Sequence, residues 1–270
     1  MTTSATHAGT FKLGGELEVN RLGFGAMRIT GDGIWGEPAD REESKRVLHR
    51  ALELGINLID TADSYGPEVS ENLIAETLHP YPDDLVIATK GGLLRDGPSK
   101  WRPDCRPEHL KEACESSLRR LKVERIDVYQ LHTVDSKVPY EESIGAIKEL
   151  QNEGKIRLAG VSNVNVEQLA TAKDIIQVVS VQNRYNLADR RSDDVLEQCE
   201  QDGIGFIPWA PLDAGKSEVP NEIALAWLLH HSEVMLPIPG TSSVEHLEQN
   251  VSAAEVDEEA LAEALSRIDL

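Results

Sequence analysis

The sequence predicts an α/β fold, a (β/α)8 TIM barrel with a short N-terminal β-hairpin and an extra C-terminal helix. Two observations lead to this prediction. Short apolar segments with the length of buried strands alternate with longer segments whose apolar residues recur at helical spacing. The alternation repeats eight times, and eight parallel strand–helix units close into a barrel. We expect residues 1–10 to be a loose tail and residues 11–270 to form one domain.

The predicted elements follow one another with ordinary start and stop signals. Residues 11–19 are expected to form the hairpin, because Gly14 and Gly15 suit its turn. The strands are predicted over residues 21–25, 56–60, 85–89, 126–131, 158–161, 178–181, 204–208 and 234–238. The helices are predicted over residues 41–54, 70–78, 107–121, 140–153, 166–176, 193–201, 221–231 and 244–251, with the extra helix over 257–268. Gly55 and Gly154 each end a helix.

A doubly wound open sheet is the structural alternative. It requires a Gly-rich turn of the form GxGxxG after an early strand. Gly23, Phe24 and Gly25 lack the third glycine, and no helix follows them directly. The pattern therefore favours the barrel.

The charge of the chain argues against several classes of partner. There are 47 Asp and Glu against 27 Lys and Arg, a formal charge of -20, which disfavours nucleic acid and anionic membrane surfaces. We interpret this as the acidic surface of a soluble protein, with adaptation to a salt-rich cytoplasm as the alternative. The longest apolar run, residues 223–229, is too short to span a bilayer, and residues 1–9 lack a signal-peptide pattern.

The three cysteines, Cys105, Cys114 and Cys199, are odd in number and lack the spacing of zinc ligands. We interpret them as free thiols of a reducing compartment, and we expect a cytoplasmic protein without a metal site. We expect a monomer or a weak oligomer.

Polar residues gather where the predicted strands end. Because all strands of such a barrel end at one mouth, we expect these residues to lie close together. Asp60 ends the second strand, Tyr65 lies in the loop after it, Lys90 ends the third strand and His132 follows the fourth. The later strand ends carry Ser162, Asn163, Gln182, Trp209 and the segment Gly240, Thr241 and Ser242.

The first four of these residues form a proton-transfer set. A tyrosine has a pKa of about 10, and an ammonium group such as that of Lys90 is expected to lower it toward neutrality. Asp60 is expected to hold Lys90 charged and in place, while His132 donates to a carbonyl oxygen. The set has no nucleophile beside a base, so it suits carbonyl reduction better than hydrolysis.

Two other functions are compatible with these residues. One is an aldolase in which Lys90 forms a Schiff base. The other is a cofactor-binding regulatory protein with little turnover. Each of the four residues alone fits an ordinary strand end, so the prediction depends on their joint arrangement at one mouth.

Five segments resemble those of a known family. They are residues 58–65 (LIDTADSY), 87–90 (IATK), 129–132 (YQLH), 159–163 (AGVSN) and 181–186 (VQNRYN). Over about residues 21–251 the chain resembles the aldo-keto reductases. Within that family, residues 35–36, 79–81, 182–186 and 238–244 are most similar to bacterial pyridoxal reductases (pyridoxine 4-dehydrogenases).

The resemblance implies a barrel oxidoreductase that uses NADPH to reduce the carbonyl of a small aldehyde or ketone, with pyridoxal as a candidate. Tyr65 would be the general acid, Lys90 and Asp60 would tune it, and His132 would orient the carbonyl.

The resemblance also implies which residues bind the cofactor and the substrate. Ser162, Asn163 and Gln182 would hold the nicotinamide carboxamide, and Trp209 would stack on its ring. The other implied cofactor residues are Pro211, Leu212, Gly240, Thr241, Ser242, His246, Gln249 and Asn250. The substrate pocket would use Trp35 and Trp101 with loop residues 93–104.

Two features depart from the family pattern. Many relatives carry Lys-Ser and a later Arg that suit a 2′-phosphate, whereas this chain has Gly240 and Thr241, with His246 at the place of the arginine. The hydroxyl groups of this segment and the start of the next helix suit a phosphate. The alternative is that these hydroxyl groups merely cap the helix. We expect the cofactor to be NADP(H) rather than NAD(H). Only about eight residues separate Leu212 from the helix at 221. A more open site with weaker cofactor retention is therefore expected, which sub-micromolar NADPH binding would contradict.

Overall fold

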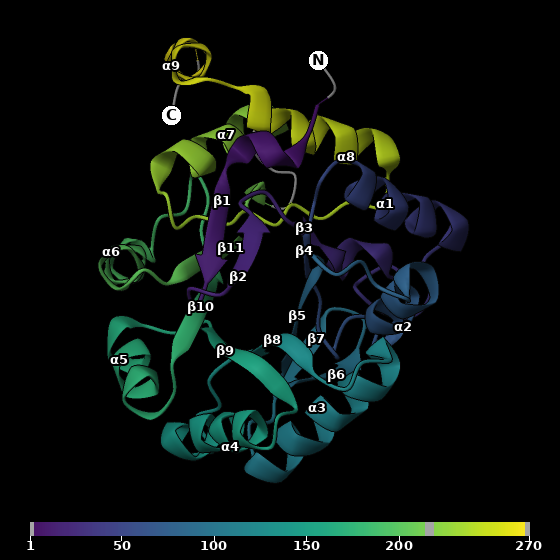
Figure 1. Cartoon of the computed structure of the whole chain (residues 1–270), viewed down its shortest axis with the longest axis vertical. Helices are drawn as coiled ribbons and strands as arrows, with labels where there is room; N and C mark the ends of the chain where they lie inside the picture. The colour runs from purple at the N-terminus through teal and green to yellow at the C-terminus, as the bar shows by residue number, and fades with distance from the viewer. Residues whose placement is uncertain (1–2, 214–218, 268–270) are drawn as a thin grey trace.

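Seven parallel strands form a curved sheet around a central core in this computed structural model, which describes residues 3–213 and 219–267 (Figure 1). The strand order is β11-β10-β9-β8-β5-β4-β3. The strands are β3 (Phe24–Gly25), β4 (Leu58–Asp60), β5 (Val86–Gly91), β8 (Ile126–Leu131), β9 (Ile156–Ser162), β10 (Val178–Arg184) and β11 (Gly205–Trp209). Every neighbouring pair is parallel, as helical crossovers require. The predicted (β/α)8 fold is confirmed.

An irregular segment, residues 234–239, fills the eighth position of the barrel. Phe206 of β11 makes two backbone hydrogen bonds of 2.8 Å with it. On the other side, the N–H of Gly23 donates to Pro237 O at 3.0 Å, and Pro239 O accepts a further bond. The predicted eighth strand is not regular, because neither proline has an N–H to give to the ladder. The segment still joins β11 to the start of the sheet and closes the ring.

Helices cover the outside of the sheet (Figure 1). They are α1 (Arg41–Glu53), α2 (Val69–Leu78), α3 (Pro107–Leu121), α4 (Tyr140–Asn152), α5 (Val166–Ile175), α6 (Asp193–Asp202), α7 (Asn221–His231), α8 (Val244–Val251) and the extra α9 (Glu258–Ser266). Helix α1 buries one face through Val47, Leu48 and Ala51, whereas α7 is buried over residues 224–229. At the start of α5, Asn165 and Gln168 form a reciprocal capping box, which fixes where that helix begins.

The N-terminal hairpin closes one end of the barrel. It consists of β1 (Thr10–Leu13) and β2 (Leu17–Asn20), paired antiparallel as predicted. Leu13 and Val19 are fully buried among interior strand residues such as Leu58, Val128 and Ile207. Burial of such side chains stabilises the fold by about 1.5–3 kcal/mol each. The carboxyl ends of the strands form the opposite end, which is left for function.

The expectation of a loose tail over residues 1–10 is wrong for residues 3–10. A 3-10 helix, η1 (Ala5–Ala8), packs against the body of the protein. Ala5 is fully buried, and its N–H donates to Leu54 O at 2.8 Å. His7 Nδ1 lies 2.6 Å from Glu255 Oε1 near the C-terminus. These contacts join distant parts of the chain, so no local signal in the tail could predict them.

A second hairpin stands at the open mouth, where a loop over residues 93–104 was expected. Strands β6 (Leu93–Gly97) and β7 (Lys100–Pro103) pair antiparallel directly after β5. The hairpin carries Trp101 toward the strand ends. The short loop predicted after Leu212 falls on residues 214–218, which lie outside the described residues. No helix in the described ranges is both long and apolar enough to cross a membrane.

Candidate active site

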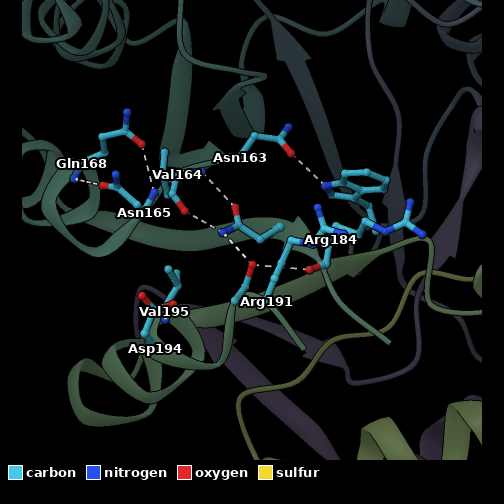
Figure 2. Close-up of a pocket in the computed structure, with 11 residues that line it drawn as sticks. Asn163, Val164, Asn165, Gln168, Arg184, Arg191, Asp194 and Val195 are labelled. Carbon is cyan, nitrogen blue, oxygen red and sulfur yellow. Dashed lines mark hydrogen bonds between the residues drawn. The ribbon is translucent and has the colours of Figure 1, made fainter. Parts of the chain in front are cut away.

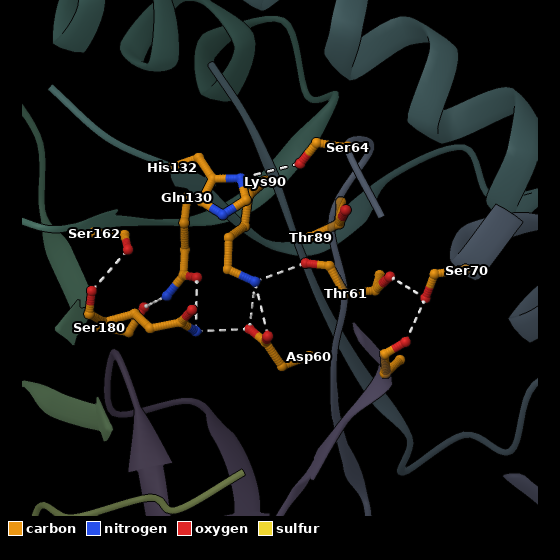
Figure 3. Close-up of polar contacts among 12 residues, drawn as sticks. Asp60, Thr61, Ser64, Ser70, Thr89, Lys90, Gln130, His132, Ser162 and Ser180 are labelled. Carbon is orange, nitrogen blue, oxygen red and sulfur yellow. Dashed lines mark hydrogen bonds and ion pairs between the residues drawn. The ribbon is translucent and has the colours of Figure 1, made fainter. Parts of the chain in front are cut away.

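Lys90 and Asp60 form a buried ion pair at the carboxyl ends of β5 and β4 (Figure 3). Lys90 Nζ lies 2.8 Å from Asp60 Oδ1 and 2.7 Å from Oδ2, and it donates to Thr61 O at 2.7 Å. Both side chains reach the same point inside the barrel because β4 and β5 are neighbours in parallel register. Burial lowers the pKa of Lys90, while the Asp60 carboxylate opposes this by favouring the ammonium form.

Tyr65 lies beside this pair, in the loop between β4 and α2. Lys90 Nζ is 5.2 Å from the centroid of its ring. The expected lowering of the Tyr65 pKa is wrong: burial, and then the charges of Asp60 and Asp63, raise this pKa well above its ordinary value. The physical reason is that Asp60 offsets the charge of Lys90 while the protein excludes water. Tyr65 is thus held as a protonated phenol, the form that gives a proton.

His132 follows β8 and faces Tyr65, with 5.8 Å between the two ring centroids. Burial, and to a smaller extent the charge of Lys90, lowers the pKa of His132 well below its ordinary value, so the imidazole is neutral. Ser64 Oγ lies 3.5 Å from His132 Nδ1 (Figure 3). If this hydroxyl donates to Nδ1, the ring carries its hydrogen on Nε2 and can donate it to a carbonyl oxygen.

Gln182 of β10 connects the ion pair to the predicted cofactor residues. Its Nε2 donates to Asp60 Oδ1 at 2.7 Å, which fixes the orientation of the amide. Within the described chain, Gln182 Oε1 receives no hydrogen bond, so it can accept one from a ligand amide. The side chains of Ser162 and Asn163 are already engaged: Ser162 Oγ donates to Gln182 O at 2.7 Å, and Asn163 Nδ2 donates to His132 O at 3.0 Å.

Trp209 ends β11 and stands between two cavities. Its Nε1 donates to Asn163 Oδ1 at 3.0 Å, a bond drawn in Figure 2. The guanidinium of Arg184 lies 5.3 Å from the ring centroid, so it covers one face and leaves the other for a flat ligand. The smaller cavity, of 520 Å³, lies toward α5 and α6. Its polar groups bond within the protein, as Asn183 does with Val164 through two hydrogen bonds, so we assign it no ligand.

The larger cavity, of 650 Å³, opens at the mouth and is bordered by Asp60, Tyr65 and His132. Other predicted residues that line it are Trp101, Ser162, Asn163, Gln182, Trp209, Pro211, Leu212, Gly240, Thr241, His246 and Asn250. The volume is that of a typical ligand pocket. Four predicted residues do not border it, namely Lys90, which is fully buried, and Trp35, Ser242 and Gln249. Trp35 is exposed at the surface, and Gln249 Nε2 donates to Glu222 instead.

The sequence analysis missed several residues of this cavity. They include Met27, Arg28, Ile34, Arg184 and Asn221, whereas Leu93 falls in the expected segment 93–104. Met27 and Arg28 directly follow the first strand, so the strand-end rule that found Lys90 could have found them as well. Ile34 comes from a segment whose approach to the mouth depends on tertiary packing, and no local pattern marks it.

Protein groups already occupy the start of α8. Ser243 Oγ accepts a hydrogen bond from the His246 N–H at 3.4 Å, and Thr241 Oγ1 accepts one from the Ser243 N–H at 3.1 Å. Glu43 Oε1 accepts from the Val244 N–H at 3.0 Å, which is the main cause of the lowered pKa of Glu43. The helix start that was expected to suit a phosphate therefore has a carboxylate in front of it.

Asp63 is an ionisable group behind the site, and its titration changes the stability of the fold with pH in a definite direction. Among the described residues, its Oδ1 is buried without a hydrogen-bond partner. Burial, and then the charge of Glu71, raises its pKa to about 8. Because the folded state holds the proton up to about pH 8 and the unfolded chain releases it near pH 4, stability falls as the pH rises between these values.

Replacing Asp63 with Asn should therefore raise the free energy of unfolding by about 1–3 kcal/mol at pH 8 and leave it nearly unchanged at pH 4. Urea unfolding at the two pH values measures this difference. Asp83→Asn, at an exposed position, is the matched control and should show no such pH dependence. An equal effect of Asp63→Asn at both pH values would contradict the titration.

Comparison with known proteins gives consistent results over nearly the whole chain. Residues 21–218 and 214–269 match the model of the Aldo/keto reductase family. The chain is 50% identical over 280 residues to an uncharacterized oxidoreductase of Schizosaccharomyces pombe, covering 98% of this chain and 90% of that protein. It is 41% identical over 280 residues to pyridoxine 4-dehydrogenase of Escherichia coli, covering 96% of this chain and 97% of that protein.

A solved structure extends the similarity to three dimensions. The crystal structure of an aldo/keto reductase from Klebsiella pneumoniae in complex with NADP and acetate matches with a TM-score of 0.78 and 27% sequence identity. The match covers 96% of this chain and 94% of that chain.

Proposed function

This chain belongs to the aldo/keto reductase family of NAD(P)H-dependent oxidoreductases, and we propose that it reduces aldehydes or ketones with NADPH, using Tyr65 as the general acid. The observation that carries the proposal is the protonated Tyr65 beside the buried Lys90–Asp60 pair, on a cavity that it shares with His132. The pKa shifts keep Tyr65 a protonated phenol and His132 a neutral imidazole, as carbonyl reduction requires.

The proposed steps follow from these protonation states. A carbonyl oxygen in the cavity accepts hydrogen bonds from the Tyr65 hydroxyl and from neutral His132, which orient it and polarise the carbonyl. NADPH, when bound, supplies the hydride to the carbonyl carbon. Tyr65 gives its proton to the oxygen as negative charge develops there. The nearby ammonium of Lys90 then stabilises the phenolate that remains.

The residues at the mouth fit a nicotinamide. Gln182 Oε1 is an unused acceptor in the described chain, and the amide that carries it is fixed by Asp60. Trp209 has one ring face not covered by Arg184. A carboxamide NH2 would donate to Gln182 Oε1, and the pyridine ring would stack on the uncovered face of Trp209. Ser162 and Asn163 support this arrangement from behind, because their side chains hold Gln182 and Trp209.

We propose NADPH over NADH and small aromatic aldehydes as substrates. The Klebsiella relative was crystallised with NADP, and the Escherichia coli relative is a pyridoxine 4-dehydrogenase. Aromatic and apolar side chains, Trp101, Leu93 and Ile34, border the cavity and suit a flat ring. Pyridoxal is therefore the first substrate to test.

The proposal makes Glu43 a residue that weakens NADPH binding. Its carboxylate occupies the Val244 N–H at the start of α8, beside the cavity residue His246. A 2′-phosphate there would be repelled by this charge. Glu43→Gln keeps the shape and removes the charge, so the Kd for NADPH should fall about three- to tenfold while that for NADH changes little.

Titration of the intrinsic fluorescence with each cofactor measures both constants. Glu42→Gln, one residue away on the same helix and exposed, is the control and should leave both constants unchanged. A parallel change for NADPH and NADH would show that Glu43 acts on the common part of the cofactor or on the fold.

A panel of aldehydes and ketones with NADPH and with NADH, followed by the absorbance of the reduced cofactor, tests the function as a whole. The expected result is turnover of aromatic aldehydes that is faster with NADPH and that Tyr65→Phe lowers by about a thousandfold. Cofactor binding without turnover of any carbonyl would instead favour the regulatory alternative.

The environment of Lys90 disfavours the aldolase alternative. Its Nζ donates three hydrogen bonds, to the two oxygens of Asp60 and to Thr61 O, and its side chain is fully buried. A Schiff base requires a neutral amine that a carbonyl carbon can reach. Trapping of an aldehyde on Lys90 by borohydride would contradict this reading.

A further inference from the structure

Arg95 of β6 is a cation held almost entirely by backbone carbonyl groups. Its guanidinium donates to Ile34 O (2.6 Å), Gly33 O (2.7 Å), Ser64 O (3.2 Å), Gly97 O (3.3 Å) and Lys100 O (3.3 Å). These carbonyls come from the loop after η2 (Ala26–Ile29), the loop that carries Tyr65, and the β6–β7 hairpin. In the described chain Arg95 has no carboxylate within ion-pair distance, so its charge is not cancelled.

The same guanidinium packs on Trp101. Arg95 and Trp101 are opposite each other across the hairpin, and the guanidinium carbon lies 3.8 Å from the centroid of the indole's ring. Trp101 is 37% exposed, so part of its surface faces solvent. Its ring nevertheless stands edge-on to both Tyr65 and His132, with centroids 6.4 Å away in each case. A cation–π contact at this distance fixes an otherwise mobile ring.

Arg95 therefore connects three structures at one point, two pairs of which are also joined by backbone hydrogen bonds. It joins the loop that supplies Ile34, the backbone next to Tyr65, and Trp101. Ile34, Tyr65 and Trp101 all border the larger cavity. Five carbonyl hydrogen bonds to one planar fork define a single geometry, which a lysine ammonium cannot reproduce.

We propose that Arg95 is the positioning residue of the substrate wall: its fork fixes Trp101 and the Ile34 loop against Tyr65, and so sets the affinity for flat aromatic aldehydes. The inference rests on the proposed reductase function for its kinetic part. Its geometric part concerns Trp101 alone and does not depend on turnover. The positive charge of Arg95 also opposes the effect of Asp60 and Asp63, which raise the pKa of Tyr65. This electrostatic effect is secondary to the hydrogen bonds of the guanidinium.

The kinetic test compares Arg95→Gln and Arg95→Lys with Arg102→Gln. Arg102 lies on the same hairpin, but it is exposed and pairs with Asp96, so its variant controls for loss of a hairpin arginine. Arg95→Gln should raise KM for an aromatic aldehyde about ten- to a hundredfold, with a smaller effect on kcat and an unchanged Kd for NADPH. Arg95→Lys should raise KM nearly as much, because it keeps the charge and loses the fork. Arg102→Gln should behave as the unmodified protein.

A KM within twofold of that of the unmodified protein in Arg95→Gln would overturn the proposal, as would equal effects in Arg102→Gln. Full rescue by Arg95→Lys would also overturn it, because charge rather than geometry would then be the cause.

A spectroscopic measurement separates this inference from the proposed function. The fluorescence of Trp101 is obtained by subtracting the spectrum of Trp101→Phe in each background, without cofactor or substrate. Arg95→Gln and Arg95→Lys should both make this component more accessible to acrylamide, while Arg102→Gln should not. If the chain reduces no carbonyl, the proposed reductase function is wrong. The accessibility of Trp101 to acrylamide then decides alone whether Arg95 positions Trp101. Unchanged accessibility in both Arg95 variants would overturn the positioning role even in an active reductase.

Discussion

Replacement of Tyr65 by phenylalanine should lower kcat for aldehyde reduction by about a thousandfold and leave the Kd for NADPH within about twofold. The variant loses only the hydroxyl, and general acid catalysis contributes about 10²–10⁴-fold. In the described chain the hydroxyl makes no hydrogen bond to protein, so its removal should not disturb the packing of the ring against Trp101 and His132. Single-turnover measurements with saturating NADPH isolate this step from product release.

The pH dependence provides a second test of the same assignment. Because burial and the charges of Asp60 and Asp63 raise the pKa of Tyr65, the acid form persists through the neutral and mildly alkaline range. Reduction should therefore show no alkaline loss from Tyr65 up to about pH 9.

Tyr140→Phe is a matched control for Tyr65→Phe. Tyr140 lies at the start of α4, and its buried hydroxyl has no hydrogen-bond partner in the described ranges, so the substitution removes the same atom away from the cavity. It should retain full activity. Retention of activity in Tyr65→Phe, or a loss in both variants, would remove Tyr65 from the proposed role.

The placement of the four strand-end residues could be predicted because a parallel barrel leaves little choice. Neighbouring strands are in fixed register, so Asp60, Lys90 and His132 at successive strand ends must converge at one mouth. Alternation of apolar strands and amphipathic helices was likewise sufficient for the fold, apart from an eighth position where Pro237 and Pro239 prevent regular pairing.

What sequence reasoning missed depends on contacts between distant segments. Arg95 is a charged residue in a loop-like stretch, and only the packed structure shows that five carbonyls and Trp101 surround it. Glu43 lies on α1, 201 residues from the N–H that it accepts from. The predicted direction of the Tyr65 pKa shift was also wrong, because a sequence shows the charge of Lys90 but not the burial that outweighs it.

Replacement of either member of the Lys90–Asp60 pair should have the largest effect on stability. Lys90→Met leaves the Asp60 carboxylate buried, and within the described residues Gln182 is then its one side-chain donor. Breaking a buried pair by removing one partner costs about 3–5 kcal/mol, so the urea midpoint should fall sharply in Lys90→Met. Asp60→Asn leaves the ammonium with Thr61 O as its remaining backbone partner and should be destabilised for the same reason.

The double variant Lys90→Met/Asp60→Asn gives the decisive comparison. It removes both charges, so no unpaired buried ion remains, and it should be more stable than the sum of the two single losses predicts. Its activity should stay as low as that of Lys90→Met, because the ammonium that stabilises the Tyr65 phenolate is absent. Additive losses of stability would mean that the two charges are not coupled. Recovery of activity in the double variant would mean that Lys90 serves the fold alone, and that the proton leaves Tyr65 without help from its charge.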